Sequence, residues 1–421
     1  MSVDELGVWL GAERVGILRR TDGRRLSFQY DADHLSRDDA VPLSLSLPLR
    51  ESSFDDMQAR PFFANLLPDA MLREAVARKL GLSPANDFAL LAALGGECAG
   101  AVSLLPCDAE PERGGEYVPL SDEEFAQIVE ELPRRPLLAG ERGIRLSLAG
   151  AQGKLPVRIE GDRVFIARGA LPTTHIVKPE IPGVEGAVRN EAFCMALATR
   201  SGLPVPRSWV RLGREPVYVV QRFDRQTGPD GTVVRRRVED FCQALGHPPE
   251  AKYESEGGPG LADVFAVLER HSTNPALDRR ALLKWTVFNA LLQNADAHAK
   301  NISLLHEPGG VRLAPFYDLL CTAAYQNVTD KLAMKVGGEG RPQWIRRRHW
   351  ERFADQVMIG PRLVRDTVAQ MAASLPVAAV ALAAEQEAAL GRAPVVDLIL
   401  RSIRARCRQA EREMAARGMG I

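Results

Sequence analysis

The segment Asn294-Ala295-Asp296-Ala297-His298-Ala299-Lys300-Asn301 and the later tripeptide Phe316-Tyr317-Asp318 decide how this chain is interpreted. Together they supply an acid, an amide five residues later, and a second acid after a strand-and-turn segment. Enzymes that transfer phosphoryl groups use this order of residues in a kinase-like fold. The pattern therefore predicts a phosphotransfer site in the carboxy-terminal half of the chain.

Each residue of the pattern has a chemical role that suits its type. The Asp296 carboxylate can orient an attacking hydroxyl and accept its proton, and Asn301 and Asp318 offer the oxygen ligands that Mg²⁺ prefers. Lys300 adds positive charge beside a transferring phosphoryl group. Asp and Asn also fill ordinary solvated loops for conformational reasons, so the octapeptide alone leaves both interpretations open.

Upstream, residues 147–154 read SLAGAQGK, a turn of small residues between two strand-like segments. Such a turn lets backbone N–H groups approach phosphate oxygens closely. Leu155 follows the lysine, so this is not a Walker A motif, which needs Ser or Thr at that position. From the residues alone, an ordinary hairpin and a phosphate-binding loop both stand as interpretations.

Two further segments lie between this turn and the octapeptide. Lys178 ends the apolar run THIVK, where a kinase-like fold places the lysine that pairs with the α- and β-phosphates. Glu191, on the following predicted helix, is its natural ion-pair partner; a strand-end lysine in solvent is the alternative. The run Val219–Arg225 (VVQRFDR) ends a strand where a kinase hinge holds adenine through backbone groups, although Phe223 fits a core position equally well.

Composition limits the remaining possibilities. The 421 residues are about three times a typical domain of ~150 residues, so two or three domains are expected. Basic and acidic residues both number 54, which leaves no global basic field for nucleic acid or membranes. The six cysteines are scattered without metal-ligand spacing, and the start MSVDELGVWLG does not have the pattern of a signal peptide. With Glu385 and Glu387 interrupting the Ala-rich stretch 377–390, we expect a soluble cytoplasmic protein without a membrane span.

The pattern along the chain predicts an α+β fold: a mixed α/β amino-terminal half with strand-rich subdomains, then an all-helical carboxy-terminal domain, in a kinase-like two-lobed architecture. Short strands with an Asp22-Gly23 hairpin turn open the chain, residues 61–80 have a helical pattern, and Ser121 caps a further helix. We predict three parts: a mixed β/α subdomain at 1–136, a nucleotide-binding α/β subdomain with the phosphate loop at 137–245, and the helical lobe with the catalytic and metal-binding loops at 246–421.

With these parts in place, the chain resembles the HipA family of bacterial toxin–antitoxin serine/threonine kinases. The matching motifs occur in the same order and span residues 61–318: PFFANLLPD, LGGECAGAV, SLAGAQGK, PTTHIVKP, NEAFCMALA, VQRFDR, EDFCQALG, KYESEGGPG, NADAHAKN and FYDL. Three of them, SLAGAQGK, KYESEGGPG and NADAHAKN, are together highly specific. The resemblance implies an ATP- and Mg²⁺-dependent protein kinase.

The resemblance also implies a role for each matching residue. Asp296 would be the catalytic base and Ser147 the autophosphorylated serine whose modification expels the phosphate loop and inactivates the kinase. Asn301 and Asp318 would hold Mg²⁺. The ATP-binding residues would be Ala149, Gly150, Ala151, Gln152, Gly153, Lys154, Lys178, Gln221, Arg222, Phe223, His298, Ala299, Lys300, Asn301, Tyr317 and Asp318. Two positions depart from the family pattern, because Gly153 and Gln221 stand where acidic residues are common.

The partners implied by the resemblance are a small helix-turn-helix antitoxin like HipB, and operator DNA only indirectly or through the antitoxin complex. The protein substrate would be an aminoacyl-tRNA synthetase, with glutamyl-tRNA synthetase as the first candidate, and growth arrest would follow. Two other functions stay open: a non-catalytic co-repressor that binds the antitoxin on DNA, and a small-molecule kinase. The presence of Lys178, Asp296, Asn301 and Asp318 argues against the first of these, and the long amino-terminal region with KYESEGGPG argues against the second.

Overall fold

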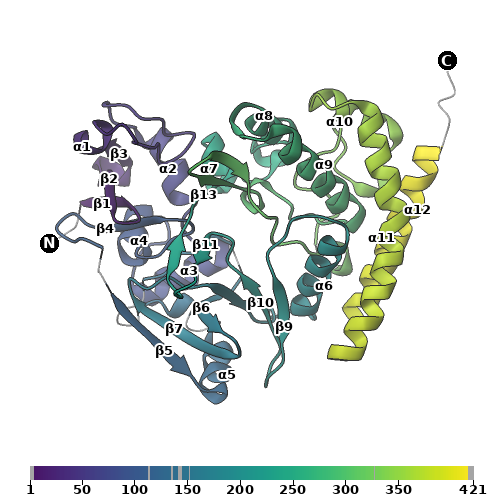
Figure 1. Ribbon diagram of the computed structural model, residues 1–421, viewed down its shortest axis with the longest axis horizontal. Coiled ribbons are helices and arrows are strands. Elements are labelled where there is room, and N and C mark those ends of the chain that lie inside the picture. The colour runs from purple at the N-terminus through teal and green to yellow at the C-terminus, as the bar shows by residue number, and fades with distance from the viewer. Residues whose placement is uncertain are drawn as a thin grey trace. The chain divides into compact units, whose positions relative to one another are not determined.

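The computed structural model describes residues 4–111, 114–133, 136–140, 145–150, 152–326 and 328–415. The chain divides into two compact units, which Figure 1 shows coloured along the sequence. The first unit consists of Met1–Pro179, Arg211–Glu250 and Leu305–Glu307. The second consists of Glu180–Val210, Ala251–Leu304 and Pro308–Ile421.

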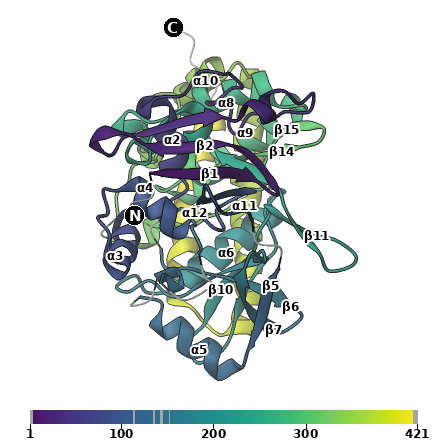
Figure 2. The same ribbon diagram turned by 90° about the vertical axis from the view of Figure 1, so that its left-hand side faces the viewer.

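An antiparallel sheet of four strands opens the first unit, in the order β3-β2-β1-β4; β1 and β2 lie side by side in Figure 2. Alternate residues Leu26, Phe28 and Tyr30 of β3 are buried, as expected for a sheet with one face on a core. Gly23, with φ 73°, turns the chain between β2 and β3, so the predicted Asp22-Gly23 turn is confirmed. The strands are β1 (Glu5–Leu10), β2 (Glu13–Arg20), β3 (Leu26–Tyr30) and β4 (Val102–Pro106).

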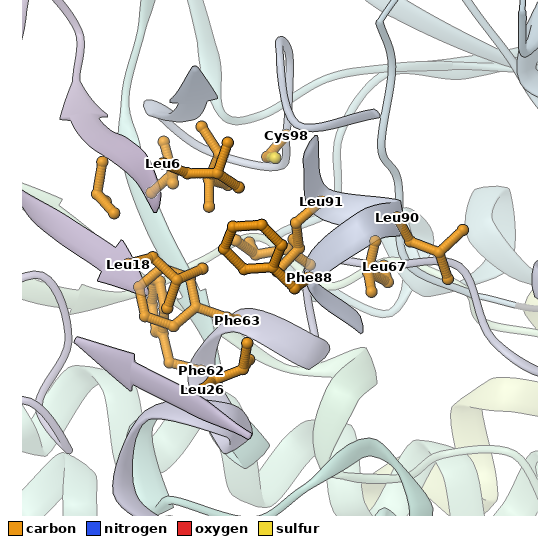
Figure 3. Close-up of a cluster of buried hydrophobic side chains, with 14 of the residues drawn as sticks. Leu6, Leu18, Leu26, Phe62, Phe63, Leu67, Phe88, Leu90, Leu91 and Cys98 are labelled. Carbon is orange, nitrogen blue, oxygen red and sulfur yellow. The ribbon is translucent and has the colours of Figure 1, made fainter. Parts of the chain in front are cut away.

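Helices pack on the buried face of this sheet and form its core, part of which Figure 3 shows. Phe62, Phe63 and Phe88 are at most 1% exposed, and the rings of Phe63 and Phe28 have centroids 5.4 Å apart. Burial of each such side chain stabilises the fold by about 1.5–3 kcal/mol. The helices of the first unit are α1 (Ala32–Leu35), α2 (Asp56–Ala64), α3 (Ala70–Leu80), α4 (Asp87–Leu94), α5 (Asp122–Glu131) and α7 (Phe241–Leu245).

The helical pattern predicted for residues 61–80 is wrong at its centre, because the structure breaks there into α2 and α3. The Asn65 side chain donates to the carbonyl of Pro61 at 2.7 Å, which offers the last turn of α2 a side-chain partner. Pro68 has no N–H and disfavours helical backbone at Leu67. The helix therefore ends here, and the turn Leu66–Asp69 that follows contacts the predicted phosphate loop.

A second antiparallel sheet of the first unit carries the segments around the predicted phosphate loop. Its strands in this unit follow the order β5-β7-β6-β8-β10. Ser121 caps α5 with a capping box closed by Glu124, as predicted. The strands are β5 (Gly115–Leu120), β6 (Leu155–Glu160), β7 (Arg163–Gly169), β8 (His175–Lys178) and β10 (Val217–Gln221), followed by the hairpin β11 (Arg225–Thr227) and β12 (Val233–Arg235) and by β13 (Arg237–Asp240).

The second unit is mainly helical, and its longest helices, α11 and α12, run side by side (Figure 1). Its core joins Phe265, Trp350 and Phe353, whose rings meet edge to face at 5.7–6.0 Å between centroids. Its helices are α6 (Ala187–Arg200), α8 (Leu261–His271), α9 (Pro275–Leu292), α10 (Arg347–Gln356), α11 (Pro361–Leu390) and α12 (Pro394–Ala415). The short strands β9 (Ser208–Arg211), β14 (Ser303–Glu307) and β15 (Gly310–Leu313) complete the list of strands.

The predicted fold class is confirmed: a mixed α/β half precedes a helical carboxy-terminal region. The prediction of an all-helical end needs one addition, since β14 and β15 interrupt the helices after the octapeptide. The division into three parts at residues 136 and 245 stays a prediction. All six cysteines are free in this structure, and five of them are buried.

Helix α11 is long and apolar enough to cross a membrane by length and composition alone. Core helices of soluble proteins pass the same test, and in this unit α11 packs against α6, α9, α10 and α12. Its buried positions include Val364, Val368, Leu375 and Leu382. These contacts bury one face of α11, and 33% of its most apolar stretch is buried.

A buried ionic cluster ties the first unit together. It consists of Glu97 and Asp224 with Arg222, Arg225 and Arg235. Glu97 Oε1 accepts hydrogen bonds from Arg222 at 3.1 Å and Arg225 at 2.8 Å, and Asp224 Oδ2 accepts from the same two arginines at 2.8 and 2.7 Å. Arg235 donates to backbone carbonyls of Gly100 and Val102.

Burial disfavours the charged form of every group in this cluster, and the neighbouring charges decide in which direction each pKa shifts. Burial raises the pKa of the Asp224 carboxyl, but the nearby Arg222 and Arg225 outweigh it and hold that pKa well below its usual range. The pKa of Glu97 is lowered for the same reason, while burial lowers the pKa of Arg235 to about 10. Since each carboxylate is charged only because its arginines are present, loss of one partner leaves an uncompensated buried charge.

We predict that Asp224→Asn lowers the free energy of unfolding by about 3–5 kcal/mol, because it leaves Arg222 and Arg225 short of negative charge. Stability from a carboxylate with a lowered folded-state pKa is present above its unfolded pKa of about 3.9 and disappears as the pH falls below it. The variant should therefore be less stable than the wild type at every pH between about 5 and 8. Its free energy of unfolding should also fall less than that of the wild type when the pH is lowered into the acid range. Urea unfolding from about pH 2 to pH 8 measures both effects.

The matched control is Asp39→Asn, because Asp39 pairs with Arg37 on the surface and is 75% exposed. This control should unfold as the wild type does. Equal unfolding curves for the two variants would contradict a structural role for the cluster.

Candidate active site

The end of helix α9 delivers the octapeptide. Gln293 caps the helix in the left-handed region with φ 60°, which stops the helical turn. Asn294 is fully buried; its Nδ2 donates to Asn289 Oδ1 at 2.9 Å and its Oδ1 accepts from the Asp296 N–H at 3.1 Å. Thr322 Oγ1 accepts from the Ala295 N–H and donates to the Gln293 carbonyl, both at 2.8 Å. These bonds fix the backbone just before Asp296.

The segment from Asp296 to Asn301 closes on itself. The Asp296 carbonyl accepts from the His298 N–H at 2.8 Å and from Asn301 Nδ2 at 2.8 Å. The five-residue spacing between Asp296 and Asn301 therefore has a geometric role, because it lets the Asn301 side-chain amide reach back to the Asp296 carbonyl. The Asp296 side chain is 46% exposed, while His298, Ala299, Lys300 and Asn301 are buried. The carboxylate of Asp296 is thus presented to solvent from a rigid base.

The FYD tripeptide is attached to the same segment. Phe316 stacks on Trp285 with ring centroids 5.8 Å apart. The Tyr317 hydroxyl donates to the Lys300 carbonyl at 2.8 Å and lies 2.6 Å from Ser303 Oγ. Asp318 then adopts φ 53°, a conformation that non-glycine residues rarely take and that Asp tolerates better than most. One hydrogen-bonded unit thereby includes Asp296 and Asn301 and, through Tyr317, the residue next to Asp318.

The oxygen donors of this region suit Mg²⁺ held together with a nucleotide. Because Asn301 Nδ2 is bonded to the Asp296 carbonyl, its Oδ1 is the atom that can face a cation. With Asp318 this gives one amide and one carboxylate oxygen donor, a usual protein contribution to a Mg²⁺ that also binds phosphates and water. Among the described residues, no group of three or more His, Cys, Asp or Glu side chains is placed to hold a metal without such help.

In the first unit, Ser147 begins the predicted phosphate loop and is completely buried. Its hydroxyl donates to the Leu66 carbonyl at 2.6 Å, and its N–H donates to the Glu97 carbonyl at 2.9 Å. The Asp69 N–H donates to the Gly150 carbonyl at 3.2 Å. The turn Leu66–Asp69 therefore holds the loop at two points, Ser147 and Gly150. The break between α2 and α3 makes these two contacts possible.

The remainder of the loop shows why it contains glycine. Gly150 has φ 102°, and an added Cβ there would lie 2.6 Å from Lys154 Nζ. Buried Lys154 donates to the Ala149 carbonyl, and Gln152 Nε2 donates to the Pro179 carbonyl at 3.2 Å. An added Cβ at Gly153 would meet no described atom within 4 Å. Ala151, also predicted to bind ATP, lies outside the described residues.

The other predicted nucleotide residues of the first unit end β8 and β10. Lys178 is buried, with its ammonium 5.8 Å from the centre of the Tyr218 ring. Gln221 is exposed and Phe223 is partly buried. The Arg222 side chain belongs to the buried ionic cluster and its backbone N–H donates to the Thr174 carbonyl at 2.9 Å, so the predicted contact with adenine falls to its carbonyl oxygen. Glu191 is buried on α6 of the second unit, and its pairing with Lys178 stays a prediction.

Several residues that shape these regions were missed by sequence reasoning. Glu97 and Asp224 lie in the motifs LGGECAGAV and VQRFDR, but the arginines that pair with Glu97 lie 125 and 128 residues away, and the Gly100 N–H that donates to Asp224 lies 124 residues away. An acid inside a glycine-rich apolar run was the available signal for Glu97. Asn294 and Thr322 gave no comparable signal, because polar residues beside turns are common.

Comparison with known proteins identifies the family of this chain. A family model described as "HipA-like C-terminal domain" matches residues 146–379, and one described as "HipA N-terminal domain" matches residues 6–105. The chain belongs to the HipA family. It is 44% identical over 381 residues to the Sinorhizobium fredii protein named "Putative kinase Y4mE", covering 88% of this chain and 90% of that protein.

Two further relatives come from Shewanella oneidensis. The protein named "Serine/threonine-protein kinase toxin HipA" is 34% identical over 372 residues, which cover 83% of this chain and 84% of that protein. A solved complex of HipA, HipB and its operator DNA contains a chain of TM-score 0.83 and 29% identity, covering 98% of this chain and all of that one. The names of the Sinorhizobium fredii and Shewanella oneidensis relatives indicate kinases, so kinase activity is supported at the level of the family.

We predict that Thr322→Val lowers the free energy of unfolding by about 1–2 kcal/mol, because it leaves the buried Ala295 N–H without its acceptor. Chemical denaturation measures the loss. Thr286→Val is the matched control: Thr286 is also buried, but its hydroxyl donates only to the Leu282 carbonyl within α9. Equal losses in the two variants would contradict a specific role for Thr322 in holding the octapeptide.

Proposed function

We propose that this HipA family protein is an ATP- and Mg²⁺-dependent serine/threonine protein kinase, the toxin of a type II toxin–antitoxin pair that acts in the cytoplasm. One observation carries the proposal. Asn301 binds back to Asp296, and Tyr317 joins the same segment to the loop of Asp318. This arrangement supports the roles predicted for the two acids and the amide. An ordinary solvated loop would not need the buried Asn294 and Thr322 to hold it.

The proposed reaction moves the γ-phosphoryl group of ATP to a serine or threonine hydroxyl. A bond forms between the hydroxyl oxygen and the γ-phosphorus, and the bond from that phosphorus to the oxygen bridging the β-phosphate breaks, releasing ADP. The hydroxyl proton passes to the Asp296 carboxylate, whose exposure leaves it accessible to a substrate. Asn301 and Asp318 would hold Mg²⁺, which neutralises charge on the phosphates when bound.

Residues of the first unit would bind the nucleotide. Backbone groups of the loop 149–154 would face the phosphates, Lys154 and Lys178 would supply positive charge, and the backbone of 221–223 would hold adenine. The residues of the second unit that we propose to contact ATP are His298, Ala299, Lys300 and Tyr317. The support is the constrained geometry of Gly150 and the burial of both lysines, which is unusual unless a lysine has a specific partner.

For partners, we propose a helix-turn-helix antitoxin like HipB, with operator DNA contacted through that complex. The support is the solved Shewanella oneidensis complex, whose HipA chain matches nearly the whole of this one. For the substrate, we propose an aminoacyl-tRNA synthetase, glutamyl-tRNA synthetase first, on the family resemblance alone. A co-repressor without kinase activity is the alternative that the experiment below separates.

We predict that purified protein gains about 80 Da on incubation with Mg²⁺ and ATP, the mass of one phosphoryl group. Asp296→Ala should slow this gain at least about 100-fold, because a general base is lost, while ATP affinity changes little. Intact-mass spectrometry follows the reaction. Asp366→Ala is the control: the Asp366 side chain on α11 is 59% exposed, and this variant should react as the wild type does. An unmodified wild-type protein that binds ATP without gaining mass would favour the co-repressor.

We predict that the added phosphate lies on Ser147 and that Ser147→Ala abolishes it. The hydroxyl is buried against Leu66, so its segment must leave this position to react and cannot return with a phosphate of about −1.5 to −2 charge. Ser147→Glu should therefore weaken ATP binding. Peptide mapping locates the phosphate, and exposed Ser374→Ala on α11 is the control. Full phosphorylation of Ser147→Ala at another residue would refute the assignment.

A further inference from the structure

The motif KYESEGGPG, residues 252–260, forms a tight loop in the second unit before helix α8. The Tyr253 carbonyl accepts from the Glu256 N–H at 2.9 Å and from the Gly258 N–H at 3.0 Å. Gly257 has φ 86°, and an added Cβ at Gly258 would lie 2.1 Å from the Ala251 carbonyl oxygen. The backbone conformation therefore requires glycine at both positions. The loop is closed by the two hydrogen bonds to the Tyr253 carbonyl.

This loop is held independently of the tyrosine hydroxyl. The Glu254 N–H donates to the Ala333 carbonyl at 3.1 Å, and the Lys335 N–H donates to Glu254 Oε2 at 2.6 Å. Asp263 closes the start of α8 by accepting from the Gly260 N–H at 2.9 Å. Removal of the Tyr253 hydroxyl alone leaves these bonds in place.

The Tyr253 hydroxyl donates to Asp296 Oδ1 at 2.7 Å. The Tyr253 ring also meets the buried His298 imidazole edge to face, with centroids 5.2 Å apart, and His298 Nε2 lies 3.6 Å from the same Oδ1. The described side-chain contacts of the Asp296 carboxylate thus fall on Oδ1. The loop therefore places the Tyr253 hydroxyl in contact with Asp296, the predicted catalytic base.

We propose that Tyr253 is a positioning residue for Asp296, and this inference rests on the proposed kinase function. A carboxylate that is about half exposed rotates freely unless a partner holds it. The Tyr253 hydroxyl fixes Oδ1, which directs Oδ2 toward the incoming serine or threonine hydroxyl. Misorientation of a catalytic group lowers the rate of chemistry without a matching loss of substrate binding.

The test is Tyr253→Phe in the full chain, which removes one hydroxyl and keeps the ring against His298. Initial rates of phosphoryl gain, measured against ATP concentration, give a maximal rate and a half-saturating concentration. We expect the maximal rate to fall about 10-fold, with half-saturation within about twofold of the wild type and an unchanged melting temperature. Tyr117→Phe is the matched control: its hydroxyl donates to the Pro172 carbonyl at 2.9 Å in the first unit, and its kinetics should not change.

Asp296→Asn, measured in parallel, separates the inference from the function on which it rests. If Asp296→Asn loses activity and Tyr253→Phe keeps a maximal rate within about twofold of the wild type, the positioning role is refuted and the kinase function stands. A rise in half-saturating ATP without a fall in maximal rate also refutes it, because Tyr253 would then act in nucleotide binding. If Asp296→Asn stays fully active, the proposed function itself fails.

Discussion

Glu97 is the residue on which the first unit depends. Its carboxylate accepts from Arg222 and Arg225, its carbonyl accepts from the Ser147 N–H, and its N–H donates to the Arg145 carbonyl. One buried residue thus joins an amino-terminal motif to the end of β10 and to the start of the phosphate loop. A buried charge is stable only when its partners are all present, so these segments are positioned together or not at all.

The second unit solves a different problem, which is to present one exposed acid from a rigid support. Gln293 ends α9, Asn294 and Thr322 bracket the turn, and Asn301 returns to the Asp296 carbonyl. Each bond satisfies a backbone group that would otherwise be buried without a partner. The functional acid therefore gains its precision from neighbouring amides and hydroxyls and not from its own burial.

The structure shows the surroundings of Gly153 and Gln221, the two positions that depart from the family pattern. No described atom lies within 4 Å of a Cβ added at Gly153, so an acidic side chain would fit among the described residues, and its absence removes negative charge beside Lys154. Gln221 is exposed at the end of β10, where a neutral amide keeps hydrogen-bonding capacity without charge. Neither position belongs to the hydrogen-bonded unit that holds Asp296, Asn301 and Asp318. The chemistry proposed for that unit does not depend on them.

The sequence by itself determined the fold class, the order of the motifs and the chemical types at the site, because capping boxes, glycine turns and the five-residue acid–amide spacing are local features. Contacts between distant residues were decided only by the tertiary structure. The partners of Glu97, the bond from Ser147 to Leu66 and the bond from Tyr253 to Asp296 join residues 43 to 128 positions apart. No local pattern encodes such pairs, because each depends on where separate helices and strands come to rest when their apolar faces are buried.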